Sequence, residues 1–101
     1  MRVLLVEDQP EMVAALRAAL ARHDMLVDHA PDLSEAEAIA AAGSYDAIVL
    51  DRQLPDGDGL SLIPKLRASG NTVPVLVLTG EFDPVTPPKY GEQIVKKIGR
   101  A

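Results

Sequence analysis

Short apolar runs alternate with longer amphipathic stretches along most of this chain. Runs rich in Val, Leu and Ile cover residues 3–6, 47–50 and 73–78, and a weaker run covers residues 26–30. Short uninterrupted apolar runs are typical of strands that a parallel sheet buries on both faces. We therefore predict four strands, with the weaker one on the outside of the sheet.

Helical patterns separate these strands. After the first strand, Pro10 suits a first helical position, and the apolar residues that follow it share one helix face. The stretch Ser34–Glu37 forms a capping box that opens a second, alanine-rich helix. Residues 60–68 predict a third helix, which Pro64 kinks or delays because proline has no N–H to donate to the carbonyl of Leu60. This alternation predicts one α/β domain with a parallel sheet and helices on both faces.

Composition narrows the class of protein. Hydrophobic residues make up 48% of the 101 positions and aromatic residues 3%, which predicts a single aliphatic core. The net charge of −5 argues against direct nucleic-acid binding and suits the binding of cations. The absence of cysteine excludes disulfides and thiolate chemistry. The chain contains no apolar run of membrane-spanning length and no basic leader before the first strand, so we expect a cytoplasmic protein.

Polar side chains that could bind a cation or take part in a reaction follow three of the predicted strands. Glu7 and Asp8 come after the first strand, Asp51 ends the third, and Thr79 ends the fourth. The carboxyl ends of parallel strands lie at one edge of the sheet, where open α/β sheets place their sites. We therefore expect the three acids to converge in one pocket. Carboxylates gathered in this way repel one another, and a hard divalent cation with oxygen ligands relieves that repulsion.

Each of these residues also has a plain structural interpretation. Alone, the pair Glu7 and Asp8 fits a solvated loop, with Asp8 as a cap of the following helix. Thr79 alone is an ordinary β-branched strand residue. The combination with Asp51 at neighbouring strand ends favours a site.

Four further polar residues have no clear part in such a site. Asp56 and Asp58 alternate with glycine, as tight turns require, so we interpret them as turn formers rather than ligands. His23 and His29 lie apart, on a predicted helix end and an edge strand. We interpret both as surface or internally satisfied histidines.

The acids at the strand ends, Thr79 and the segment Leu54–Gly59 together resemble a response-regulator receiver domain, the phosphoacceptor module of two-component signalling. The resemblance covers about residues 1–80. It implies a flavodoxin-like fold whose four strands follow the order 2-1-3-4. The tail of this chain departs from the family pattern, so we expect the usual fifth strand and last helix to be lacking.

The resemblance also implies a role for each site residue. Asp51 would accept a phosphoryl group from a histidine kinase or phosphotransfer protein. Mg²⁺, or Mn²⁺, would be held by Glu7, Asp8 and Asp51 together with the backbone carbonyl of Gln53. Thr79 would bond a phosphoryl oxygen once it is present.

The tail carries a second resemblance. Residues 75–88 resemble the acid-bearing strand and loop of peptidase-type α/β-hydrolases, with Asp83 at the position of the acid. The chain has no Gly-x-Ser-x-Gly motif and no histidine after Asp83, so a catalytic triad cannot be assembled. We therefore expect no enzyme activity, and we interpret the chain as two α/β pieces joined near the fourth strand, as in a chimera.

Two arrangements of the atypical tail, residues 81–101, remain open. One is a loop followed by a helix that begins at Pro87 or Pro88 and carries an apolar stripe. The other makes residues 93–98 a fifth strand and places Lys96 beside the phosphate. We favour the helix, because the strand would require a crossover near the minimum length for a parallel connection.

These observations lead to one functional hypothesis and one alternative. The hypothesis is a single receiver-like domain over residues 1–101 that accepts a phosphoryl group on Asp51 with Mg²⁺ and is impaired in switching. The alternative is an engineered or chimeric structural protein that keeps an acidic metal pocket without signalling. We also expect a homodimer, formed through the open edge of the fourth strand, the face of the first helix or an exchanged C-terminal helix. The cognate kinase and the regulated output cannot be named from the sequence.

Overall fold

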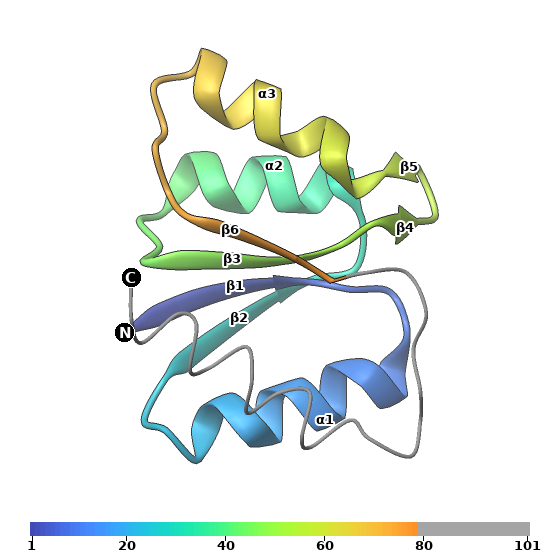
Figure 1. Ribbon diagram of the computed structural model, residues 1–101, viewed down its shortest axis with the longest axis vertical. Helices are drawn as coiled ribbons and strands as arrows, with labels where there is room; N and C mark the ends of the chain where they lie inside the picture. Colours follow the sequence, from blue (N-terminus) through green and yellow to red (C-terminus); the bar gives the residue numbers. More distant parts are fainter. Residues whose placement is uncertain (79–101) are drawn as a thin grey trace.

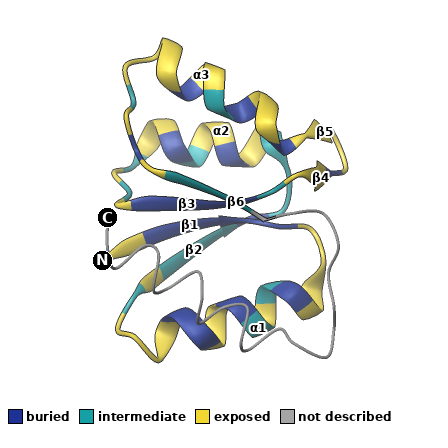
Figure 2. Ribbon diagram, in the orientation of Figure 1, coloured by how far each residue is buried: buried dark blue, intermediate teal, exposed yellow. Residues whose placement is uncertain are grey.

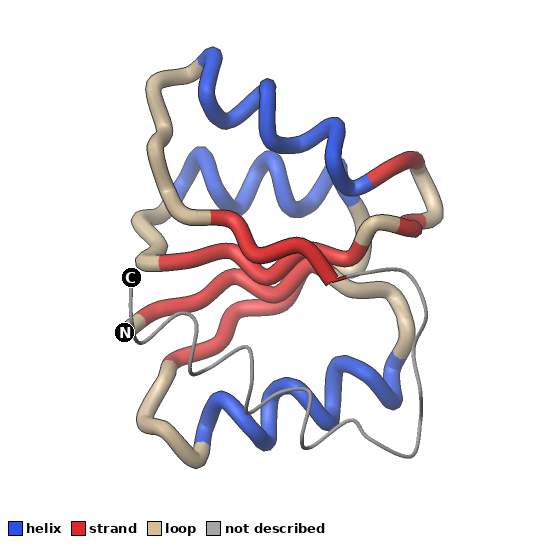
Figure 3. The backbone as a smooth tube through the Cα atoms, viewed as in Figure 1, coloured by secondary structure: helices blue, strands red, loops and turns tan. Residues whose placement is uncertain are grey.

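The computed structural model describes residues 1–78, in which a parallel sheet of four strands lies between two layers of helices (Figure 1). The sheet has the order β2-β1-β3-β6, which is the predicted order 2-1-3-4, since two short strands intervene in the numbering. Its strands are β1 (Arg2–Val6), β2 (Leu26–Ala30), β3 (Ala47–Asp51) and β6 (Val75–Leu78). The short strands β4 (Gln53–Leu54) and β5 (Gly57–Asp58) form a separate antiparallel hairpin, which the sequence pattern did not predict. Figure 3 shows this hairpin beyond the end of the main sheet.

Helices cover both faces of the sheet, as predicted. Helix α1 (Pro10–Ala21) packs on one face, whereas α2 (Leu33–Ala42) and α3 (Leu62–Ala68) lie on the other. A short 3-10 turn, η1 (Gly59–Ser61), precedes α3. Because this turn replaces the first part of the predicted third helix, Pro64 falls in the first turn of α3, where its missing N–H costs no hydrogen bond.

The central strands supply both halves of the core. In β1, Val3 and Leu5 pack toward α1, whereas Leu4 and Val6 pack toward α2 and α3, and all four side chains are fully buried. The pattern repeats in β3, whose apolar residues alternate between the same two clusters. Figure 2 shows β1 and β3 buried over most of their length, which explains their uninterrupted apolar sequences.

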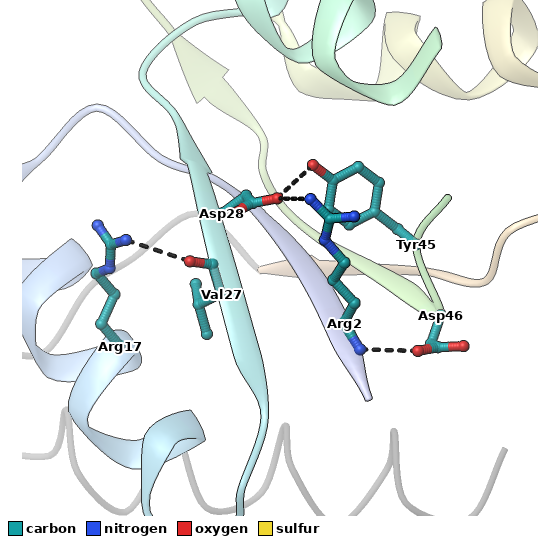
Figure 4. A network of polar contacts seen from close by, with 6 residues as sticks. All are labelled: Arg2, Arg17, Val27, Asp28, Tyr45 and Asp46. Atoms are coloured by element: carbon teal, nitrogen blue, oxygen red, sulfur yellow. Dashed lines mark hydrogen bonds and ion pairs between the residues drawn. The ribbon is translucent and has the colours of Figure 1, made fainter. Parts of the chain in front are cut away.

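Strand β2 forms an outer edge of the sheet, as predicted from its weaker pattern. Leu26 at its start is 69% exposed, and the middle of the strand is half-buried. The guanidinium of Arg17 in α1 donates to the carbonyl of Val27 at 3.2 Å (Figure 4). This bond satisfies an acceptor of the edge strand that another strand would otherwise pair with.

A polar network links β1, β2 and the two residues that precede β3 (Figure 4). One carboxylate oxygen of Asp28 accepts from the Arg2 guanidinium at 2.9 Å and from the Tyr45 hydroxyl at 2.6 Å. The hydrogen bond from Tyr45, followed by that from Arg2, holds the pKa of Asp28 below its usual value. The backbone N–H of Arg2 donates to Asp46 at 2.7 Å. Polar side chains thus secure the edge opposite the acidic residues.

The start of α2 differs from the predicted capping box at Ser34–Glu37. The helix begins at Leu33, and its N-cap is Asp32, whose side chain accepts from the N–H of Glu35 at 2.8 Å. The prediction was wrong by two residues because an aspartate can cap as well as a serine, and Asp32 stands at the end of the extended segment.

The predictions for Thr79 and for residues 81–101 lie outside the described part of the chain. They include the lack of a fifth strand and last helix, the C-terminal helix and the alternative position of Lys96. Within residues 1–78 no helix has both the length and the apolar character needed to cross a bilayer.

Candidate functional site

Three acidic side chains meet at the carboxyl edge of the sheet. Strands β1 and β3 are hydrogen-bonded neighbours with Val6 opposite Leu50, so the residues that follow them come close together. One carboxylate oxygen from each of Glu7, Asp8 and Asp51 lies within 4.8 Å of the other two. In residues 1–78, no other group of acidic or histidine side chains has this spacing.

Glu7 is the buried member of this acidic cluster. The residue is 2% exposed, and its backbone is held by two neighbours: its N–H donates to the Ala30 carbonyl at 3.1 Å, and its carbonyl lies 2.7 Å from Nε2 of His29. Its carboxylate accepts from the N–H of Gln9 at 3.1 Å. Burial, together with the negative charge of Asp51, raises the pKa of Glu7 to about 7. The Glu7 carboxyl therefore keeps its proton to a much higher pH than an exposed glutamate does.

Asp51 ends β3 and is half-buried. Burial also raises the pKa of Asp51, and the charge of Asp8 adds to the effect, while the N–H of Gln53 opposes it by donating to the carboxylate at 3.3 Å. Asp8 itself is exposed. The site thus combines a buried acid, a half-buried acid and a solvent-facing acid, and their mutual repulsion disfavours full ionisation without a cation.

The donor set fits a hard divalent cation such as Mg²⁺. All three side chains offer oxygen, and opposite ligands on an octahedral Mg²⁺ are about 4.2 Å apart. The three oxygens of the acidic cluster lie within 4.8 Å of one another, which is close enough for them to surround one such ion. Glu7, Asp8 and Asp51 could therefore share one ion, with water completing its coordination.

The loop after Asp51 folds back onto the end of β3. The N–H of Gly59 donates to the carbonyl of Arg52 at 2.6 Å, and a Cβ added to Gly59 would overlap the carbonyl oxygen of Asp51. Only glycine fits at this close approach. The sequence motif showed a turn here but not this contact between the turn and the backbone of Asp51.

Asp56 and Asp58 lie in this loop but not in the acidic cluster. Asp58 accepts from the N–H of Leu60 at 3.0 Å and pairs with Arg52 at 3.5 Å, so it acts as a local turn former, as predicted. Asp56 instead accepts from the backbone N–H groups of Leu33 and Ser34 in α2, at 2.9 and 3.1 Å. Sequence reasoning missed this contact because no local pattern links residues so far apart.

The two histidines and Thr79 were also considered in the sequence analysis. His29 is internally satisfied, as expected: a carbonyl can only accept, so Nε2 of His29 carries the proton in its bond to Glu7. His23 is exposed at the end of α1. Thr79, the fourth candidate side chain, lies outside the described residues.

Comparison with known proteins gives a consistent set of sequence matches. The family model for the response regulator receiver domain matches residues 3–93. RcaC of Microchaete diplosiphon is 40% identical over 81 residues, and the transcriptional regulatory protein TcrA of Mycobacterium tuberculosis is 44% identical over 78 residues. These alignments cover 80% and 77% of this chain but 12% and 31% of the relatives. The matched part of the chain therefore covers less than a third of the length of either relative.

Solved structures share the fold. The chemotaxis response regulator CheY4 of Vibrio cholerae matches with a TM-score of 0.82 and 24% identity, covering 98% of this chain and 96% of that one. The receiver domain of the Francisella response regulator 1452 matches with a TM-score of 0.81 and 21% identity, covering 98% and 93%. These likenesses confirm the predicted flavodoxin-like sheet with helices on both faces.

The sequence match continues beyond the point where the resemblance was expected to end. The family model runs to residue 93, whereas the sequence analysis placed the limit near residue 80. The comparisons give no support to a hydrolase-like tail, to a junction of two pieces or to a purely structural protein. The motif around Asp83 is short, and a short motif alone is a weak basis for assigning a family.

Proposed function

This chain belongs to the response regulator receiver domain family, and we propose that it is a Mg²⁺-dependent phosphoacceptor of a two-component phosphorelay, phosphorylated on Asp51. The observation that carries this proposal is the acidic cluster at the ends of β1 and β3. Asp51 is the member that combines partial burial with a backbone donor on its carboxylate. These features suit a nucleophile that is held in place and still accessible.

The reaction would be a transfer between two side chains. A carboxylate oxygen of Asp51 attacks the phosphorus of a phosphohistidine on a histidine kinase or phosphotransfer protein. The new P–O bond forms as the P–N bond breaks, and the donor histidine leaves with the electron pair and takes up a proton. The product is an acyl phosphate on Asp51, and the chain acts as a signalling receiver rather than as an enzyme with a separate substrate.

The other residues would prepare Asp51 for this transfer. Glu7, Asp8, Asp51 and the backbone carbonyl of Gln53 would hold Mg²⁺, which neutralises negative charge on the transferring group when bound. Burial raises the pKa of Glu7, so a bound cation would have to displace the proton of this carboxyl, and the affinity for the cation should increase with pH. Thr79 would bond a phosphoryl oxygen.

The remaining proposals concern the domain as a whole. We propose one receiver-like domain over residues 1–101, located in the cytoplasm, with the homodimer described above as its assembly. Its own surface, with a net charge of −5, disfavours direct contact with nucleic acid. Switching would be impaired if the tail brings no lysine to the phosphate, because a charge-assisted partner of the phosphoryl group would then be missing.

A small phosphodonor tests the function without knowledge of the kinase. Purified protein is incubated with acetyl phosphate and Mg²⁺, and an acid-stable, alkali-labile acyl phosphate is measured by intact-mass spectrometry. We expect the adduct on the natural chain, none on Asp51→Asn, and little on Asp8→Ala or after chelation of the metal.

The matched control is Asp46→Asn, which makes the same change at the opposite end of the sheet. Its phosphorylation should equal that of the natural chain. An adduct of equal yield on Asp51→Asn would contradict the assignment of Asp51. A natural chain that binds Mg²⁺ but forms no adduct would contradict the phosphoacceptor function.

A further inference from the structure

Asp56 connects the loop after the phosphoacceptor to a different element of the fold. It stands in the turn between β4 and β5, and its two carboxylate oxygens accept from the N–H groups of Leu33 at 2.9 Å and Ser34 at 3.1 Å. These are first-turn donors of α2, which have no partner within the helix. The hydrogen bond from Leu33 is the main cause that lowers the pKa of Asp56, so the residue is ionised and bonded at neutral pH.

The β4–β5 hairpin needs such an external contact. It pairs only two residues on each side, Gln53 with Asp58 and Leu54 with Gly57, and a two-stranded hairpin is marginal on its own. Leu54 packs into the core, but its neighbour Gln53 is exposed. A Cβ added to Gly57, whose φ of 147° is in the range that favours glycine, would lie 3.2 Å from Cδ1 of Leu33. The hairpin tip therefore sits directly against the start of α2.

The hairpin begins at the acidic cluster. Gln53 is the first residue of β4, and its N–H donates to the carboxylate of Asp51. At the far end of the loop, Gly59 is fixed against the backbone of Asp51 and Arg52. The tip is thus the part of the loop that lies farthest along the chain from both attachments, and Asp56 holds it.

We propose that Asp56 is a positioning residue of the phosphoacceptor site: by docking the β4–β5 hairpin on the N-terminus of α2, it holds the backbone of Gln53 in place beside Asp51. This inference rests on the proposed function, because it assigns Asp56 to the same metal and phosphoryl site. Asp56 touches neither the cation nor the phosphoryl group, and it acts through the hairpin.

The chain offers a matched control at the same helix end. Asp32 is the N-cap of α2 and accepts from Glu35 at 2.8 Å, as Asp56 accepts from Leu33 and Ser34. Both carboxylates stabilise the first turn, but the bond made by Asp32 stays within its own segment. Losing either one weakens the helix, whereas losing Asp56 alone also releases the hairpin.

The experiment compares Asp56→Ala, Asp56→Asn and Asp32→Ala in the full chain. The melting temperature is measured with the metal chelated, the Mg²⁺ dissociation constant by calorimetry, and the rate of adduct formation with acetyl phosphate by intact mass. Both alanine variants should melt at lower temperature than the natural chain. Asp56→Ala should raise the Mg²⁺ dissociation constant about tenfold, the loss typical of removing a residue that orients a ligand, and should slow phosphorylation. Asp32→Ala should change the affinity less than about twofold.

Asp56→Asn keeps one acceptor oxygen, so its affinity should fall between those of the natural chain and Asp56→Ala. It also provides a folded variant if the alanine form does not fold. Unchanged affinity and rate in both Asp56 variants, or an equal loss in Asp32→Ala, would overturn the positioning role and leave the proposed function standing. A natural chain without Mg²⁺ binding or phosphorylation would overturn both proposals.

Discussion

Replacing Glu7 by glutamine should make the metal-free protein less sensitive to pH. The Glu7 carboxyl is buried beside Asp51, and its pKa rises from 4.5 to about 7 on folding. The folded state therefore binds more protons than the unfolded state between these two values. The stability that this proton provides is fully present below pH 4.5 and is lost as the pH rises through 7.

The size of the effect follows from the same shift. With one group of unfolded pKa 4.5 and folded pKa about 7, the free energy of unfolding should fall by about 2.5 kcal/mol between pH 5 and pH 8. Asp51 also has a raised pKa and adds to this fall. Asp28 and Asp56 have lowered pKa values, so their contributions to the free energy of unfolding are lost only below about pH 4. They do not affect the change between pH 5 and pH 8.

Urea denaturation in the presence of a chelator measures these free energies at pH 5 and pH 8. Glu7→Gln has nearly the same shape and does not titrate, so its stability should exceed that of the natural chain at pH 8 and change much less with pH. In 10 mM Mg²⁺ the difference in stability between the two proteins at pH 8 should become smaller. A site with a dissociation constant of about 1 mM adds about 1.4 kcal/mol to the free energy of unfolding of the natural chain. A metal-free natural chain whose stability rises from pH 5 to pH 8, or a Glu7→Gln variant that loses as much as the natural chain, would refute the reasoning.

The remaining predictions concern the loop, the tail and assembly. Gly59→Ala should destabilise the protein by about 1–3 kcal/mol or more in urea denaturation, because the added Cβ overlaps the carbonyl oxygen of Asp51. If the tail is helical, Lys96→Ala and Lys97→Ala should leave the lifetime of the acyl phosphate unaltered, and a marked change for Lys96→Ala alone would favour the fifth-strand arrangement. Light scattering across a concentration series should show the mass of a dimer, and a monomer at high concentration would contradict the proposed assembly.

The central strands and the acidic cluster could be predicted from the sequence because both depend on one local property, whereas the order of the strands was implied by the resemblance to receiver domains. Each central strand is buried on both faces, so β1 and β3 carry uninterrupted apolar sequences that end where the sheet ends. The first polar residues beyond these runs, Glu7 and Asp51, are then placed at the edge by strand length alone. The burial of Glu7 could not be read in this way, since it depends on Ala30 and His29 of the neighbouring strand.

The contacts made by the loop after Asp51 could not be predicted. The hairpin of β4 and β5, the close approach of Gly59 to Asp51 and the bonds from Asp56 to α2 all depend on how the loop packs in three dimensions. In sequence, Asp56 and Asp58 are indistinguishable members of an alternating Asp-Gly pattern. In the structure Asp58 accepts a hydrogen bond within its own turn, whereas Asp56 accepts hydrogen bonds from the first turn of α2, in a separate part of the chain.

The position of the cluster follows from the topology. The connection after β1 runs through α1 to β2, and the connection after β3 runs through α3 to β6 on the other side, so the chain diverges between β1 and β3. Such a divergence leaves a crevice at the carboxyl ends of the two strands. Glu7 lies at these carboxyl ends, where burial raises its pKa and makes its ionised form costly in the metal-free fold. A bound cation would offset the cost of ionising this buried acid. The pH dependence of the stability of Glu7→Gln, measured with and without Mg²⁺, tests this directly.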